Sequence, residues 1–181
     1  MITFWEHGFE GASLAVLEDA TGLSTPSIYN TFGSKEGLYR ACLDHYGQHV
    51  GQEVTAALDF EHPGREDAAR MLRTAASQYT APGRPHGCMF ALGALGVGAQ
   101  HASITDLCAD RRRSLVADLR RYLKAAQRVG TLSAGADIAS LARYLAAVLQ
   151  GMAIQARDGA GRRQLEHLAE HALLAWPEGE D

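Results

Sequence analysis

Small hydrogen-bonding side chains gather on one face of the segment from Ser24 to Phe32. Ile28 and Phe32 stand four residues apart, so a helix in this segment would bury both on one side. The residues left on the opposite face are Thr25, Ser27, Asn30 and Thr31. Their hydroxyl and amide groups suit contacts with base edges or phosphates, so the pattern predicts a helix that recognises DNA.

Two histidine pairs have the spacing of metal ligands on a helix. His167 and His171 match the H-x-x-E-H pattern that supplies two zinc ligands and a general base in some metalloproteases. Only ten residues follow this pattern, so a third acidic ligand is difficult to supply beyond Glu178. His45 and His49 are also four residues apart, which is common by chance on a long helix. We therefore expect a protein that is not an enzyme, with no metal and no cofactor.

The cysteines offer a second kind of chemistry. They are Cys42, Cys88 and Cys108, an odd number without C-x-x-C spacing. This arrangement argues against a disulfide framework or a cysteine zinc site and fits a reducing cytoplasm. Cys88 follows His86 and could act as a nucleophile or redox sensor, but the apolar residues after it favour an inert, buried thiol.

The segment from Leu14 to Phe32 must position the polar face. Ser13 is suited to cap a helix that starts at Leu14, and Gly22 can take a positive φ where that helix ends. We expect Leu23 to be buried between this helix and the next. Ser24 is suited to cap the second helix, with Pro26 in its first turn, where a missing N–H costs little. Two short helices joined by so tight a turn are typical of a helix-turn-helix.

The whole chain favours an all-α fold. It has 181 residues, 46% of them hydrophobic, with long stretches rich in Ala, Leu, Arg and Glu and no convincing alternating strand. The longest weakly polar run, Gly87 to Ala99, is shorter than the roughly 20 residues that a membrane span needs. No signal peptide is apparent, so we expect a cytoplasmic protein without a membrane partner.

Charge is distributed unevenly along the chain. Residues 1–46 hold six acidic residues and two basic ones, which leaves fifteen of each for the remainder, so the net charge of -4 lies in the proposed DNA-binding part. DNA binding draws on Lys and Arg, so this balance counts against tight binding. Residues 1–8 look like the last two turns of a helix that ends at Gly8. We expect that the rest of that helix, with a basic arm, precedes Met1.

Further helices are predicted from the apolar spacing. Ser34 should cap a long helix that runs to about Leu58, and 61–65 reads as a linker. Residues 66–80 should form an amphipathic helix, and 81–87 a loop. We expect residues 88–100, with Gly93, Gly96 and Gly98, to form a helix buried at the centre of a second domain. The predicted domains are 1–46 and 47–181.

The last three helices are expected at 103–129, 138–157 and 162–176. Ser103 and Asp106 have the spacing of a capping box, Gly130 should end the first of these helices, and Asp137 should cap the second. The apolar stripes of the last two predict a four-helix bundle with a two-fold copy of the chain. The residues predicted at that dimer interface are Ile138, Leu141, Leu145, Val148, Leu165, Leu168, Ala172 and Trp176.

An apolar cavity with a few polar groups is a further hypothesis for the second domain. Each candidate could equally be an ordinary core residue. The candidates are Met71, Tyr79, Cys88, Met89, Phe90, Tyr144, Met152 and Gln155.

The order FWEHGFEGASLAVLEDATGLSTPSIYNTFGSKEGLYRACLDHY resembles the TetR/AcrR-type transcriptional repressors. The similarity rests on G-F after an aromatic residue, on G-L-S before the second helix, and on Y-x-x-F-x-S-K-E. The later AAVLQGMAIQARDGA is similar to one AcrR-type ligand domain. The resemblance implies a homodimer, a ligand pocket in each C-terminal domain and a ligand-dependent separation of the two heads.

The resemblance also implies roles for single residues. Ser13 would contact phosphate, and Tyr29 and Lys35 would grip phosphates. The residues that would face bases or backbone are Ser24, Thr25, Pro26, Ser27, Asn30 and Thr31.

The sequence therefore predicts a ligand-responsive repressor that binds a near-palindromic operator as a homodimer. Its two recognition helices would enter successive major grooves about 34 Å apart. A small apolar effector of unknown identity would release it. The alternative is a dimeric ligand-binding module whose head is too incomplete to hold operator DNA.

Overall fold

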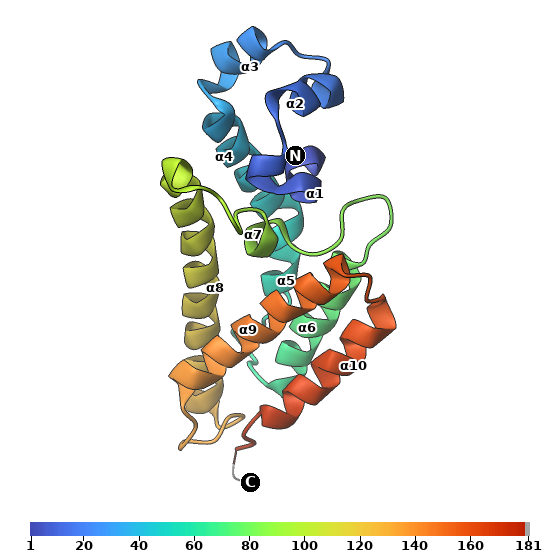
Figure 1. Cartoon of the computed structure of the whole chain (residues 1–181). Coiled ribbons are helices and arrows are strands. Elements are labelled where there is room, and N and C mark those ends of the chain that lie inside the picture. Colours follow the sequence, from blue (N-terminus) through green and yellow to red (C-terminus); the bar gives the residue numbers. More distant parts are fainter. Residues whose placement is uncertain (180–181) are drawn as a thin grey trace.

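The chain forms a small head joined to a longer helical body. The computed structural model describes residues 1–179, and these contain helices and no β-strand, which confirms the predicted all-α fold. Figure 1 shows α2 and α3 at one end of the molecule, with α1 between them and the body. We refer to residues 1–46 as the head and to the residues after them as the body. The helices of the head are α1 (Ile2–Gly11), α2 (Leu14–Thr21), α3 (Thr25–Phe32) and α4 (Lys35–Tyr46).

Helix α4 continues from the head into the body. It passes through a π-helical turn, η1 (Gly47–Gly51), into α5 (Gln52–Ala56), and we call residues 35–56 the linking helix. Its buried side carries Cys42, Tyr46, Val50 and Val54. The π-turn was not predicted, and such turns are frequent at functional sites.

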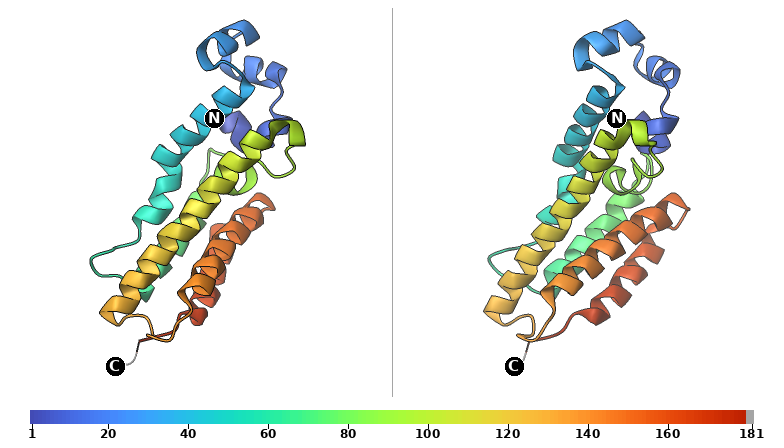
Figure 2. Two further views of the ribbon diagram at one scale, coloured as in Figure 1. Left: turned by 90° about the vertical axis from the view of Figure 1, so that its left-hand side faces the viewer. Right: turned by 60° about the vertical axis from the view of Figure 1, so that its left-hand side comes forward.

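Four longer helices build the body. They are α6 (Arg65–Tyr79), α8 (Ala102–Val129), α9 (Ile138–Arg157) and α10 (Arg162–Ala172), the last followed by η3 (Leu173–Ala175). Helix α9 packs on α8, α6 and α10, and α10 also packs on α6. Figure 2 shows α8 running the length of the body alongside the linking helix. Gly130 ends α8 with φ 85° and Asp137 caps α9, both as predicted. No helix within residues 1–179 is long and apolar enough to cross a membrane.

Gly8 interrupts α1 and ends its first helical stretch. Its φ is 69°, and the helix resumes after the kink as far as Gly11. Phe4, Trp5 and Phe9 are buried on the two sides of the kink, so both parts of α1 belong to the core. The prediction that the first helical stretch stops at Gly8 is therefore confirmed, whereas the short turn after it was not predicted.

The prediction of a buried helix at 88–100 was wrong. Only α7 (Met89–Leu92) is α-helical there, and turns lead from it to η2 (Ala99–His101). Gly96 has φ 77°, which breaks a helix, and the side chain of Leu95 is 62% exposed. A Cβ on Gly93 would lie 2.4 Å from the hydroxyl oxygen of Tyr39, so the glycine permits a close approach to the head. We call residues 88–101 the junction segment.

The capping box predicted at Ser103 is absent from the described residues. Helix α8 begins at Ala102, so Ser103 lies inside its first turn. Its hydroxyl donates to the carboxylate of Glu36 in α4 at 2.9 Å, and Asp106 is exposed. A partner from the head thus replaces the local cap.

Most residues of the predicted dimer interface lie inside the protomer. Leu141 and Leu145 of α9 and Leu165 of α10 are buried, as are Ala172 and Trp176, while Ile138, Val148 and Leu168 are partly buried against the same core. Their apolar stripes are covered by α6 and α8 of the same chain, which the stripe pattern alone could not reveal. The buried members of this set are covered within the protomer, whereas Ile138, Val148 and Leu168 keep part of their surface exposed. A partner would have to bind the outer side of α9 and α10.

Candidate nucleic-acid interface

Local caps fix both helices of the helix-turn-helix. The Ser13 hydroxyl accepts from the Val16 N–H at 3.3 Å, and the Ser24 hydroxyl accepts from the Ser27 N–H at 3.4 Å. Gly22 takes the left-handed conformation between them with φ 68°. These contacts confirm the predicted caps and turn. Ser34 caps α4 in the same way, through the Gly37 N–H at 3.0 Å.

Helix α3 presents its polar face to solvent. Ile28 is fully buried and Phe32 packs partly against the core, which leaves the other side of the helix open. The Thr31 hydroxyl donates to the Ser27 carbonyl at 3.0 Å. Thr25 is half-buried, whereas the other residues predicted on this face are exposed. Those exposed residues are Ser24, Pro26, Ser27, Tyr29, Asn30 and Thr31.

Glu18 fixes the crossing of α2 and α3, a role that the sequence analysis missed. Its carboxylate accepts a hydrogen bond from the backbone N–H of Thr25, the first residue of α3, at 2.5 Å. Bonds from the side chain and backbone of Thr25 lower the pKa of Glu18, so the carboxylate stays charged at the positive end of the helix dipole. An acid seven residues before a predicted helix start was the available signal.

The turn is closed by Thr21 and not by Leu23. The Thr21 hydroxyl donates to the Leu17 carbonyl at 2.7 Å and accepts from the Leu23 N–H at 3.2 Å. The Leu23 side chain is 45% exposed, so the prediction that it is buried between the helices was wrong. The Thr21 hydroxyl thus holds the corner through two bonds to the backbone, and the Leu23 side chain lies at the surface.

Lys35 lies at the edge of the head. Its ammonium is 4.6 Å from the centre of the Phe9 ring, a cation–π arrangement that leaves the side chain half-buried. Burial lowers the pKa of Lys35, and the negative charge of Glu10 opposes that shift. The ammonium is therefore held beside α1, at the start of α4.

Several acidic residues of the head face the body and not the surface of α3. The Glu10 carboxylate accepts from the Gly98 N–H at 3.1 Å, and Glu36 bonds His101 at 2.8 Å. Asp44 pairs with Arg111 at 2.5 Å. Together with Glu18, these residues account for most of the negative charge that counts against DNA binding. The acidic composition of the head is thus largely engaged in intramolecular contacts.

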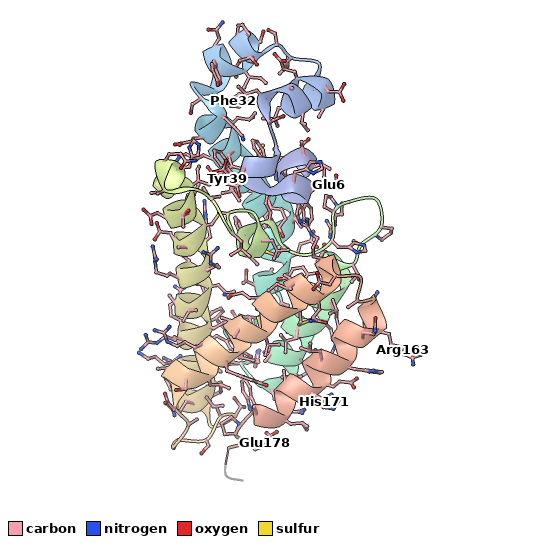
Figure 3. The ribbon with its side chains drawn as sticks, viewed as in Figure 1. Glu6, Phe32, Tyr39, Arg163, His171 and Glu178 are labelled. Atoms are coloured by element: carbon pink, nitrogen blue, oxygen red, sulfur yellow. The ribbon has the colours of Figure 1, made fainter. Side chains whose placement is uncertain are left out.

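Direct hydrogen bonds join the head to the body. The Phe9 N–H donates to the Gly93 carbonyl of the junction segment at 3.0 Å. Arg157, at the end of α9, donates to the carbonyls of Glu6 and Trp5, each at 2.7 Å. Figure 3 labels Glu6 in α1 and Tyr39 in the part of α4 beside α1. A movement in the body can therefore reach α1 without passing through a flexible tether.

A cavity of about 370 Å³ lies beside the linking helix, within the range of small-molecule sites. Three residues of the predicted pocket, Tyr79, Cys88 and Phe90, line it. The other predicted members lie elsewhere. Met71, Met89 and Met152 are fully buried core residues outside the lining, whereas Tyr144 and Gln155 are exposed on α9. The lining also includes charged residues that were not predicted, Asp44, Arg111, Arg112 and Asp118.

The histidine pair of α10 that has the spacing of metal ligands is on the surface. The His171 ring bonds the His167 carbonyl at 2.8 Å, and both residues are exposed on α10, where Figure 3 labels His171 and Arg163. Within residues 1–179 no three His, Cys, Asp or Glu residues are grouped so that they could hold a metal ion. The three cysteines are buried free thiols. Along α8, Arg113 pairs with Asp110 and Arg121 pairs with Asp118.

Comparison with known protein families matches both parts of the chain. Residues 1–42 match the family described as "Bacterial regulatory proteins, tetR family". Residues 68–172 match "Tetracyclin repressor-like, C-terminal domain".

Two repressors are similar to this chain along nearly its whole length. The HTH-type transcriptional repressor ComR of Escherichia coli K12 is 34% identical over 98% of this chain and 85% of its own length. The HTH-type transcriptional repressor BdcR of the same organism is 28% identical over 96% of this chain and 82% of its own. A solved structure of a cysteine mutant of the TetR family transcriptional regulator CifR, complexed with 26bp double-strand operator DNA, superposes with a TM-score of 0.92. It is 37% identical, and the match covers 97% of this chain and 92% of that one.

Proposed function

This chain belongs to the TetR family of bacterial regulatory proteins and is a DNA-binding transcriptional regulator, and we propose that it is a homodimeric repressor released by a small effector. The observation that carries the proposal is the capped, solvent-facing α3, whose polar side is free while Ile28 anchors the other side. The complex of the similar CifR with operator DNA supports the same use of the head.

We assign the contacts to DNA by exposure and chemistry. Asn30 has an exposed amide that can pair with a base edge, and Thr25, Pro26, Ser27 and Thr31 lie beside it on α3. Ser13, Ser24, Tyr29 and Lys35 flank these residues and suit phosphate contacts that set the register of the head. Two heads would then read the halves of a near-palindromic operator about 34 Å apart.

The outer side of α9 and α10 is the proposed dimer face. Ile154 is 45% exposed, Tyr144 is also exposed, and Ala147 and Gly151 lie between them on the same side of α9. Small residues at such positions let another helix approach closely. Leu174, after α10, is 77% exposed and extends the apolar surface. A second copy placed on this face would bury side chains that the protomer leaves in water.

The cavity beside the linking helix is the proposed effector site. Its lining includes Tyr46, Gly47 and Gly51, so a bound molecule would touch the helix that carries the head. A shift of this helix changes the spacing of the two heads. A coupling of about 1 to 3 kcal/mol between cavity and head is enough to alter operator occupancy substantially.

The test measures the affinity of the protein for labelled DNA from upstream of its own gene. Fluorescence anisotropy at low salt reports the binding. A scrambled duplex of the same composition is the control. We expect the native sequence to bind tighter by about a thousandfold or more. Equal affinity for both duplexes would contradict the proposed repressor function. It would favour the alternative, a ligand-binding module whose head does not bind an operator.

A further inference from the structure

The walls of the cavity are apolar on one side and charged on the other. Tyr79, Phe90, Leu115 and Leu149 give it aromatic and aliphatic surface. The linking helix closes one wall with the π-turn, where a Cβ on Gly51 would lie 2.9 Å from the Phe90 ring. The charged groups come from α8 and from the end of α4.

The acidic residues of the wall are already paired. Asp44 bonds Arg111 at 2.5 Å, and Asp118 bonds Arg121, which lies outside the cavity, at 2.6 Å. Arg112 is different, because no carboxylate within residues 1–179 lies within 4.0 Å of its guanidinium. One nitrogen of Arg112 donates to the Phe90 carbonyl at 3.0 Å.

The Arg112 charge is therefore the unbalanced charge of the lining. A guanidinium has five N–H donors in a planar fork that matches a carboxylate or sulfonate. Arg112 is half-buried, so its charge is only partly screened by water.

We propose that the cavity binds a small organic anion with a flat apolar body, whose carboxylate or sulfonate is received by Arg112. The body would lie against Phe90, Tyr79 and Leu115. This inference rests on the proposed effector function and names the chemical class of the effector. It adds a negative charge to the small apolar effector expected from the sequence.

The two phenols of the lining are compatible with an anion. Burial and the neighbouring Cys88 raise the pKa of Tyr46 and of Tyr79, so both phenols stay neutral at physiological pH. They add no negative charge to the cavity, and a neutral hydroxyl can donate a hydrogen bond to the anion.

Arg112 also connects the cavity to the head. The Phe90 carbonyl that it holds belongs to the junction segment, whose Gly93 carbonyl accepts from Phe9 of α1 at 3.0 Å. An anion would compete with the Phe90 carbonyl for the guanidinium. Binding would thereby loosen the junction segment from α8 and change the support of α1 and of the π-turn.

Two fluorescent probes that differ by one charged group test the proposal. Anilinonaphthalene sulfonate is an aromatic anion, and N-phenylnaphthylamine has the same ring system without the sulfonate. Each is titrated into the wild-type chain and into Arg112→Gln. Arg113→Gln is the matched control, because Arg113 is the next residue on α8, lies outside the cavity and pairs with the exposed Asp110.

We expect one sulfonate probe per chain, bound tighter than the neutral probe. Arg112→Gln should raise the Kd of the sulfonate by about tenfold or more and leave the Kd of the neutral probe unchanged. The neutral probe thus reports whether the cavity survives the substitution. Arg112→Lys should restore part of the affinity because it keeps the charge and loses only the fork.

Three results would overturn the proposal. The first is equal affinity of the wild-type chain for both probes. The second is an equal loss of affinity for the sulfonate probe in the Arg112 and Arg113 variants. The third is that neither probe binds. Operator binding, measured separately by anisotropy, keeps this failure distinct from failure of the proposed function. A chain that binds its operator without any preference for the anion refutes only the assignment of the effector.

Discussion

The guanidinium of Arg157 donates a hydrogen bond to the main-chain carbonyl of Trp5 at 2.7 Å. In an unbroken helix that carbonyl would accept from the Phe9 N–H, but the kink at Gly8 turns this N–H to the Gly93 carbonyl. The kink thus leaves the Trp5 carbonyl without its helical partner, and Arg157 at the end of α9 donates to it instead. Since α9 belongs to the proposed dimer face, this contact ties the dimer to α1 of the head.

Replacement of Arg157 should loosen the head from the body. Arg157→Gln removes the donor for the carbonyls of Trp5 and Glu6, and we expect it to reduce the free energy of unfolding by about 1 to 3 kcal/mol. It should also weaken operator binding, because the two heads are less firmly spaced. Urea unfolding and anisotropy measure the two effects. Arg128→Gln, an exposed arginine on α8, is the control and should change neither.

Replacing Asn30 and replacing Lys35 should change DNA binding in different ways. Asn30→Ala removes an amide that can read a base, so we expect affinity for the best sequence to fall while the preferred sequence at that position relaxes. Lys35→Gln should weaken binding to all DNA sequences alike. It should also reduce the slope of log K against log salt concentration by about one. Anisotropy titrations over a salt series and a set of single-base operator variants separate the two. A salt slope unchanged in Lys35→Gln would show that this ammonium does not contact phosphate.

The helix-turn-helix was predictable because its determinants are local. Ser13, Ser24 and Ser34 each bond a backbone N–H three residues ahead, so the cap and its partner lie in the same short stretch of sequence. The burial of Ile28 follows from helical spacing in the same way. Glu18 was harder to assign, because its partner lies beyond a turn whose geometry must be known first.

The junction segment and the covering of α9 within the protomer were not predictable for the opposite reason. An apolar run with Gly93 and Gly96 is compatible with a buried helix. The segment instead joins the head to the body through its contacts with Phe9 and Tyr39, which are far away in the sequence. Likewise, the stripe of Leu141 and Leu145 reveals that one side of α9 is covered. It does not reveal whether α6 and α8 or a second chain covers it.

Acid should open the contact between α4 and α8. Bonds from His101 and then Ser103 lower the pKa of Glu36, so the folded state binds its proton less readily than the unfolded chain. The stabilisation is therefore complete above the ordinary carboxyl pKa of about 4.3 and is lost as the pH falls through the lower value of the folded state. Urea midpoints at neutral pH and at about pH 3 measure the loss. Glu36→Gln should be less stable at neutral pH and should lose less stability on acidification, and an equal loss in both proteins would contradict this role.

A charge on the outer side of α9 should separate the proposed dimer. Ile154 is exposed in the protomer, so Ile154→Asp leaves the protomer core intact and places a carboxylate where the second copy would pack. We expect sedimentation velocity to show monomers at concentrations where the wild type is dimeric, with the helical circular dichroism unchanged. Operator binding should weaken strongly, because a single head loses the gain from binding both half-sites together. Ala117→Asp, on the exposed side of α8, introduces the same charge elsewhere and should remain dimeric. Dimers that persist in Ile154→Asp would place the interface on another surface.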